Sequence, residues 1–322
     1  MLSLPDFQEK QLLFVQAEWG KPSSLRIYND NIVFEKEKKV INRVSLQKVF
    51  AVFICGDLSL TTSFLRKTKE HGVSVFLLKH NFEMYADLSA AAEGHYLLRE
   101  KQYSLSPEHQ LSMARPLIVN KVENQVALLK LKKNIKKNRD LRQKIEGWKR
   151  EATTADSLES LLGLEGTISR YYFSEQFRDM KWRRRAPRTR EDITNLLMDM
   201  GYTFLFHLVD AILRLHGFDT YKGFYHQLFF QRKSLACDLV EPFRCIIDKQ
   251  IVKSHNLGQI KETDFIFKNG SFEFAPAKRA EYATIFMQCL MDRKEEIFTY
   301  IQGFYRHVMD PSKHAFPYYQ FG

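Results

Sequence analysis

The stretch that most constrains the fold spans residues 190–215 and reads REDITNLLMDMGYTFLFHLVDAILRL. Apolar residues recur along it at spacings of three or four, which is the period of one helix face. These residues are Ile193, Leu197, Met200, Phe204, Leu208, Ala211 and Leu215. Gly217 follows closely, where a helix commonly ends. The stretch therefore predicts a long helix with one buried face.

Helical periodicity extends on both sides of this stretch. Further helices are predicted over residues 112–148, 157–177 and 234–252. Ser157 is a candidate N-cap for the second of these, because its hydroxyl can accept a free backbone N–H. Residues 318–322, after Pro317, are expected to form a loose tail. Residues 106–322 are thus predicted to be an all-α domain.

The first 86 residues have a different character. Short segments rich in β-branched and aromatic residues predict strands, with one helix between them over residues 59–71. The strands are predicted at residues 12–17, 24–28, 32–35, 49–54 and 73–78. Asn29 and Asp30 favour a hairpin turn, because both residue types tolerate positive φ. The sequence predicts an α+β protein: a small antiparallel, sandwich-like β domain (1–86), a connector (87–105) and the helical domain.

Composition limits the class of protein. Hydrophobic residues make up 44% and charged residues 27% of the 322, which is typical of soluble globular proteins. We expect no membrane-spanning segment and no signal peptide, and hence a cytoplasmic protein. The four cysteines are scattered without zinc-ligand spacing, so reduced thiols are expected. The net charge of +11 favours a polyanionic partner but does not distinguish nucleic acid from an anionic membrane surface.

Acidic and imidazole groups stand in unusually apolar surroundings at four positions: Glu165, His226, Asp238 and Glu241. The spacing of three between Asp238 and Glu241 places both carboxylates on one helix face. Two carboxylates and a neutral imidazole would suit Mg²⁺ or Mn²⁺, which polarises a phosphodiester. Because Glu165 precedes His226 by 61 positions, the residues alone do not establish that these groups converge. Salt bridges to the many arginines are the alternative for each acidic residue.

Several segments, in order and spacing, resemble CRISPR-associated protein one (Cas-one), the integrase of spacer acquisition. One of them is SLACDLVEPFR at residues 234–244, and no single segment is decisive without the ordered combination. The others are residues 165–173, 187–202 and 217–226, with 96–102 and 120–125 before them. The agreement covers residues 96–250, and the strand-rich start matches less specifically.

This resemblance implies an N-terminal β domain that mediates dimerisation and a helical catalytic domain. It implies that Glu165, His226 and Glu241 form the catalytic metal-binding triad for Mg²⁺ or Mn²⁺, with Asp238 as an auxiliary acidic residue. The implied reaction is transesterification: the 3′-hydroxyl of a captured double-stranded DNA fragment attacks a phosphodiester at a CRISPR repeat. Endonuclease activity and a partnership with CRISPR-associated protein two, in a higher assembly than the homodimer, are implied as well.

Basic residues supply candidates for DNA contacts. Arg183, Arg184 and Arg185 follow Trp182, an aromatic residue that could stack on a splayed base. Arg232 and Lys233 follow His226 and could hold a phosphate. A solvated basic loop is the alternative for these residues. Two other functions remain open: a stand-alone structure-specific nuclease of DNA repair, and a non-catalytic DNA-binding scaffold.

Overall fold

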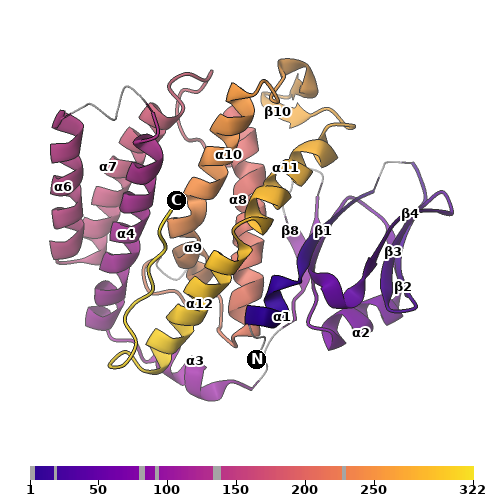
Figure 1. Cartoon of the computed structure of the whole chain (residues 1–322), viewed down its shortest axis with the longest axis horizontal. Coiled ribbons are helices and arrows are strands. Elements are labelled where there is room, and N and C mark those ends of the chain that lie inside the picture. Colours follow the sequence, from indigo (N-terminus) through magenta and orange to yellow (C-terminus); the bar gives the residue numbers. More distant parts are fainter. Residues whose placement is uncertain (1–3, 18–19, 80–83, 91–93, 133–138, 227–229) are drawn as a thin grey trace.

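The computed structural model describes residues 4–17, 20–79, 84–90, 94–132, 139–226 and 230–322. The strands of the first part of the chain lie at one side of the molecule and the long helices lie at the other (Figure 1). The predicted α+β class, a strand-rich start followed by a helical region, is therefore confirmed.

The N-terminal part contains two four-stranded sheets. The first has the strand order β1-β5-β7-β8, and the second has the order β4-β3-β2-β6. The bounds are α1 Leu4–Gln8, β1 Gln11–Gln16, β2 Ser23–Tyr28, β3 Asn31–Lys36, β4 Lys39–Ser45, β5 Val49–Cys55, β6 Ser59–Leu60, α2 Thr62–Glu70, β7 Ser74–Leu78 and β8 Met84–Leu88. Strands β4, β6 and β8 were not predicted, and β8 extends past the expected domain boundary at residue 86.

Strand β5 explains how the two parts of the molecule are joined. All seven of its residues are buried. Phe53 faces the helical part, where its ring contacts that of Phe204 at 5.5 Å between centroids, while Val52 and Ile54 belong to the core shared with the second sheet. A strand that is covered on both faces has a continuous apolar sequence instead of an alternating one. The first sheet is thus the middle layer of the molecule.

The prediction of an antiparallel domain was wrong for part of this region. Strand β5 pairs in parallel with both β1 and β7, and the connection from β5 to β7 includes α2. A parallel pair needs such a crossover, whereas the antiparallel pairs β2–β3 and β3–β4 need only short turns. In the turn between β2 and β3, Asn29 and Asp30 have φ values of 46° and 53°, as predicted from their residue types.

The helical part is built around α8. Its helices are α3 Tyr96–Tyr103, α4 Pro107–Leu129, α6 Arg139–Thr154, α7 Leu158–Gln176, α8 Ile193–Leu215, α9 Ser234–Val240, α10 Arg244–Asn256, α11 Arg279–Met291 and α12 Lys294–Met309, with 3₁₀ turns at Leu46–Lys48, Glu241–Phe243 (η2) and Glu262–Asp264. Helix α8 is long and apolar enough to cross a membrane, contrary to our expectation that no segment would be. Because 83% of its apolar window is buried inside the protein, it has the character of a core helix.

Gly201 explains how closely α8 packs. A Cβ atom at this position would lie 2.4 Å from Cγ2 of Ile247 on α10, and 3.1 Å from the ring of Phe286 on α11. Glycine normally weakens the middle of a helix, so this close approach is the physical reason for its presence.

Three predictions for the helical part differ from the structure. The predicted helix 112–148 is two helices, α4 and α6, separated by residues outside the described part of the chain. The predicted helix 234–252 is interrupted by η2, where Pro242 cannot donate an N–H to a continuous helix. The region also contains a two-stranded hairpin, β9 Phe265–Lys268 with β10 Ser271–Phe274, and so is not entirely helical.

The C-terminal segment is docked and not loose. The amide of Asn120 on α4 exchanges two hydrogen bonds with the backbone of Tyr319, at 2.7 and 2.9 Å. Asn124, one turn later, accepts the N–H of Phe321 at 3.0 Å and donates to the carbonyl of Pro242 at 3.1 Å. The Tyr319 and Phe321 side chains are buried, so α4, η2 and the C-terminal segment form one packed unit.

Candidate functional site

The predicted triad is distributed over three separate elements. Glu165 lies on α7, which begins after Ser157, whose hydroxyl caps the helix by accepting the N–H of Ser160 as predicted. His226 lies in the loop between α8 and α9, and Glu241 is the first residue of η2. Because α4 contacts both α7 and η2, it brings the two glutamates to one place.

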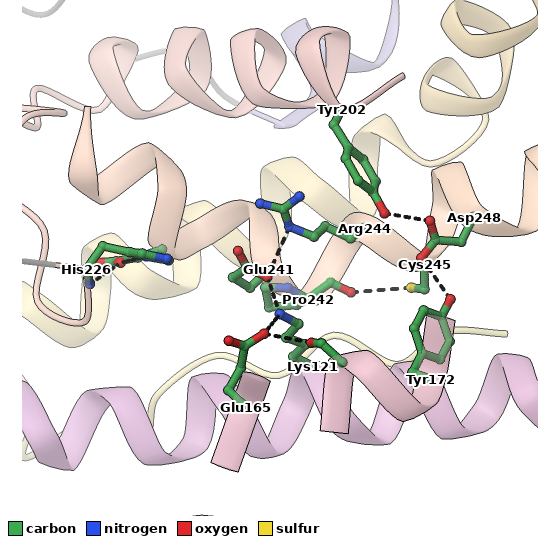
Figure 2. A network of polar contacts seen from close by, with 12 residues as sticks. Lys121, Glu165, Tyr172, Tyr202, His226, Glu241, Pro242, Arg244, Cys245 and Asp248 are labelled. Carbon is green, nitrogen blue, oxygen red and sulfur yellow. Dashed lines mark hydrogen bonds and ion pairs between the residues drawn. The ribbon is translucent and has the colours of Figure 1, made fainter. Parts of the chain in front are cut away.

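Lys121 on α4 joins these two glutamates. Its ammonium forms an ion pair with Oε1 of Glu165 and another, at 2.6 Å, with Oε2 of Glu241 (Figure 2). The Lys121 and Glu241 side chains are only 7% and 6% exposed, whereas that of Glu165 is 21% exposed. The structure therefore places two carboxylates from distant parts of the sequence around one buried positive charge.

Further contacts fix the two carboxylates. The hydroxyl of Ser169, one helical turn after Glu165, donates to Oε1 of Glu165 at 2.7 Å. Arg244, one turn after Glu241, donates through Nε to Oε2 of Glu241 at 3.0 Å. Burial by itself would raise the pKa of Glu241, but Arg244, Lys121 and His226 together lower it to about 2. Glu241 is thus held in its ionised form, which is the form that binds cations.

Asp238 organises the loop that carries His226. Its Oδ2 accepts the N–H groups of Phe224 and Tyr225 at 2.8 and 3.1 Å, and its Oδ1 accepts the N–H of His226 at 2.8 Å. Oδ1 also lies 2.7 Å from Nδ1 of the His226 ring. Because a carboxylate can only accept, a neutral His226 carries its hydrogen on Nδ1 and keeps a lone pair on Nε2. Asp238, the predicted auxiliary residue, is therefore a positioning residue for His226.

The loop approaches Asp238 so closely that it requires a glycine. A Cβ atom on Gly223 would lie 2.6 Å from Oδ2 of Asp238 and 2.8 Å from the backbone carbon of Ser234. Only a residue without a side chain fits between the loop and the start of α9 at this point.

Tyr225 adds a polar group to the same region. Its buried hydroxyl has no hydrogen-bond partner among the described residues. Burial raises the pKa of Tyr225, and the carboxylates of Glu165, Glu241 and Asp238 raise it further, so this hydroxyl lies within electrostatic reach of all three.

The residues present fit a divalent cation in part. The two glutamates already face one positive charge, and oxygen ligands are those preferred by Mg²⁺ and Mn²⁺. Within the described residues, however, no three His, Cys, Asp or Glu side chains lie close enough together to hold a metal ion. His226 helps to lower the pKa of Glu241, but its side chain does not form one cluster with the two glutamates. The arrangement thus offers a carboxylate pair with an oriented imidazole nearby.

A second buried network adjoins the site. The hydroxyls of Tyr202 and Tyr172 donate to the two oxygens of Asp248, at 2.6 and 2.8 Å. The guanidinium of Arg244 lies 4.7 Å from the ring centroid of Tyr202, and that of Arg185 lies 5.6 Å from it. Arg244 therefore connects Glu241 to the network around Asp248 (Figure 2).

Two of the predicted DNA-binding residues have structural partners instead. Arg185 donates to Asn195 at 2.9 Å and to Asp199 at 2.7 Å, which anchors its loop to α8. The ammonium of Lys233 is buried against Asp210 at 2.8 Å and lies 3.5 Å from Asp87 on β8. Both basic side chains therefore neutralise buried or half-buried carboxylates within the protein.

The other three basic candidates are exposed. Arg183 and Arg232 lie on the surface, and Arg184 pairs there with Glu191 at 3.1 Å. A hollow of about 500 Å³ lies beside Arg183, which lines it together with Met180, Lys181, Trp182, Glu191 and Asp192. Trp182 packs at 5.9 Å from Phe177, measured between ring centroids. The basic and aromatic character expected of this loop is thus present at an open surface.

Lys121, Arg244 and Tyr225 were not predicted as site residues. Lys121 had a recognisable signal, since it is a charged residue between Ile118 and Val122 on the buried face of a predicted helix. Arg244 follows Glu241 by three positions, the spacing of an ion pair on one helix face. Only the folded structure could show that the partners of Lys121 are 44 and 120 positions away.

Comparisons with known proteins identify similar chains. The family model described as CRISPR associated protein Cas1 matches residues 19–288. A CRISPR-associated endonuclease Cas1 of Thermodesulfovibrio yellowstonii is 28% identical over 303 residues, which cover 90% of this chain and 95% of the relative.

Solved structures share the fold. A casposase bound to its integration product has a TM-score of 0.79 at 19% identity, covering 94% of this chain and 92% of the casposase. A chain of a Cas6-RT-Cas1–Cas2 complex has a TM-score of 0.81 at 22% identity, covering 98% of this chain and 36% of that longer chain. At these identities the structural similarity concerns the fold alone.

Proposed function

Because the chain belongs to the Cas1 family of CRISPR-associated proteins, we propose that it is a divalent-metal-dependent DNA integrase with endonuclease activity. The observation that carries this proposal is the pair formed by Glu165 and Glu241. These two carboxylates come from different helices, and both form an ion pair with the Lys121 ammonium. The name of its Thermodesulfovibrio yellowstonii relative, an endonuclease, supports phosphodiester chemistry.

The proposed reaction is transesterification. The 3′-hydroxyl oxygen of a captured DNA fragment forms a bond to a phosphorus atom at a CRISPR repeat, and the bond from that phosphorus to the repeat strand breaks. The repeat strand leaves with a 3′-hydroxyl, so one phosphodiester replaces another and no nucleotide cofactor is needed. Hydrolysis differs only in using water as the nucleophile. The similarity to a casposase solved with an integration product supports the joining reaction.

Each site residue has a proposed role. Glu165 and Glu241 would hold Mg²⁺ or Mn²⁺ together with Nε2 of His226, and the ion would stabilise charge that develops on the phosphate. Asp238 orients His226 through Nδ1 and holds the loop in place through three backbone N–H groups. Arg244 keeps Glu241 ionised.

DNA is the proposed polyanionic partner. The net charge of +11 and the exposed Arg183, Arg184 and Arg232 support binding through phosphates. Binding is expected to weaken steeply as the salt concentration rises, because each phosphate contact releases a counterion. A fluorescence-anisotropy titration at several salt concentrations measures this slope, and a flat response would contradict the proposal.

We also propose a homodimer that forms through the β domain in the cytoplasm, and a Cas2 partner. Strand β4 is an edge strand with Val40 and Ile41 exposed at 58% and 56%, and an apolar sheet edge favours pairing with another chain. The similarity to a chain from a complex that contains Cas2 supports the second partner. Sedimentation of the purified protein with and without Cas2 tests both assemblies.

The experiment that tests the function offers two substrates with Mn²⁺: a branched DNA, and a supercoiled plasmid carrying a CRISPR repeat together with a labelled DNA fragment. An integrase joins the label to the plasmid. Cleavage of the branched DNA without joining would favour the stand-alone repair nuclease, and neither product would favour a DNA-binding scaffold.

A further inference from the structure

A lysine is an unusual residue on the buried face of a helix, and Lys121 occupies such a position on α4. Its ammonium is paired with Glu165 and Glu241, and its side chain is only 7% exposed. Burying three charged groups costs free energy, and a buried ion pair is seldom more stable than apolar residues of the same size. Stability alone therefore gives little reason for a lysine at this position.

We propose that Lys121 is a resident counter-cation that occupies the Glu165–Glu241 pair in the metal-free protein and competes there with the divalent ion. This inference rests on the proposed metal site. It assigns Lys121 a positioning role: the ammonium holds the two carboxylates in place before the ion enters, and leaves the position between them when the ion binds.

A count of charges supports displacement. Glu165 and Glu241 carry two negative charges, which Lys121 and Arg244 already neutralise through their ion pairs. Adding a divalent ion while Lys121 stays in place would leave these four groups and the ion with a net charge of +2 in a largely buried site, which is costly. Displacing Lys121 lowers that charge to +1, and the buried carboxylate of Asp238 beside His226 opposes the remainder.

Helix α4 is held in place around Lys121, whereas the lysine side chain is intrinsically flexible. Asn120 and Asn124, on either side of Lys121, tie α4 to the C-terminal segment and to Pro242 through four hydrogen bonds. The lysine itself has a flexible four-carbon stem and a single charged group.

The test compares wild type with Lys121→Met, which keeps the length of the side chain and removes its charge. Thermal unfolding is followed in EDTA and across a Mn²⁺ titration, and the Mn²⁺ dissociation constant is measured by calorimetry. The matched control is Lys149→Met, which removes a lysine from a more exposed pair with Glu123 at 2.7 Å. Glu165→Gln reports whether Mn²⁺ binds at this site.

We expect Lys121→Met to unfold at a lower temperature than wild type in EDTA and to gain more stability from Mn²⁺. Its Mn²⁺ affinity should be at least about tenfold higher, because a positive charge a few ångströms away no longer opposes the ion. Lys149→Met should behave as wild type. If Lys121→Met does not fold in EDTA, Lys121→Gln provides the same comparison, since it keeps a hydrogen bond to one carboxylate.

Two results would overturn the inference, and they differ in meaning. In the first, Lys121→Met binds Mn²⁺ no more tightly than wild type does, while Glu165→Gln loses Mn²⁺ binding. This result would show that Lys121 is only structural and would leave the proposed function intact. Absence of Mn²⁺ binding by wild type would overturn the metal site and the inference with it.

Discussion

Asp248 is a buried acid beside the candidate site, and its surroundings determine how stability changes with pH. Its side chain accepts the hydroxyls of Tyr202 and Tyr172, and the residue is 1% exposed. Burial raises the pKa of Asp248 from 3.8 to about 6, although the two tyrosine hydrogen bonds and the nearby Arg244 and Arg185 oppose this rise. The folded protein therefore binds this proton more tightly than the unfolded chain does.

The direction of the effect follows from linkage. The stability contributed by protonated Asp248 is fully present below its unfolded pKa of 3.8 and is lost as the pH rises through about 6. A shift of about two pKa units corresponds to roughly 3 kcal/mol, most of which is lost between about pH 4 and about pH 7.5. The stability contributed by Glu241 depends on pH in the opposite direction. Its pKa is lowered from 4.5 to about 2, so this contribution is present above pH 4.5 and is lost as the pH falls from there through about 2.

The assay is urea unfolding of wild type and Asp248→Asn over this pH range. The difference between the two proteins isolates Asp248, because Glu241 contributes equally to both. We expect wild type to lose about 2 kcal/mol or more relative to the variant between about pH 4 and about pH 7.5. Parallel pH profiles for wild type and Asp248→Asn would refute the reasoning.

Three further substitutions test the packing around the site. Tyr319→Ala should lower the free energy of unfolding by about 3 kcal/mol, because it removes a buried ring that lies 4.7 Å from that of Phe243; chemical denaturation would show a change below about 1 kcal/mol if the C-terminal segment were loose. Lys233→Ala should destabilise the protein by about 3 kcal/mol while leaving the salt dependence of DNA binding unchanged, and a shallower salt slope would return this residue to the DNA-binding set. Gly223→Ala should lower the melting temperature by displacing Asp238, and an unchanged melting temperature would contradict the close approach.

The sequence predicted those features that depend on local patterns. The apolar stripe of residues 190–215 gave α8, which the structure bounds at Ile193–Leu215, and Asn29 with Asp30 gave the turn between β2 and β3. Parallel pairing of β5 could not be predicted in this way, because a strand covered on both faces has no alternation to show which neighbours it pairs with.

The sequence supplied the candidate residues of the site but not their electrostatic partners. The resemblance supplied Glu165 and Glu241, and the structure brings their side chains to one ammonium. The competing explanation, salt bridges to arginines, applies to Glu241 through Arg244, while the shared partner is a lysine. The partners of Lys233, Asp210 and Asp87, lie on a different helix and on a strand of the N-terminal part. Such long-range pairs leave no local pattern in a sequence.

The most direct measurement of the central claim is strand joining by Glu165→Gln. A labelled DNA fragment with free 3′-hydroxyls is incubated with a repeat-bearing plasmid and Mn²⁺, and DNA binding is measured in parallel. Because the variant keeps its hydrogen-bonding shape but loses the charge that holds a cation, joined product should fall at least about hundredfold while DNA binding persists. Joining at the wild-type rate would show that the pair formed by Glu165 and Glu241 does not carry the chemistry.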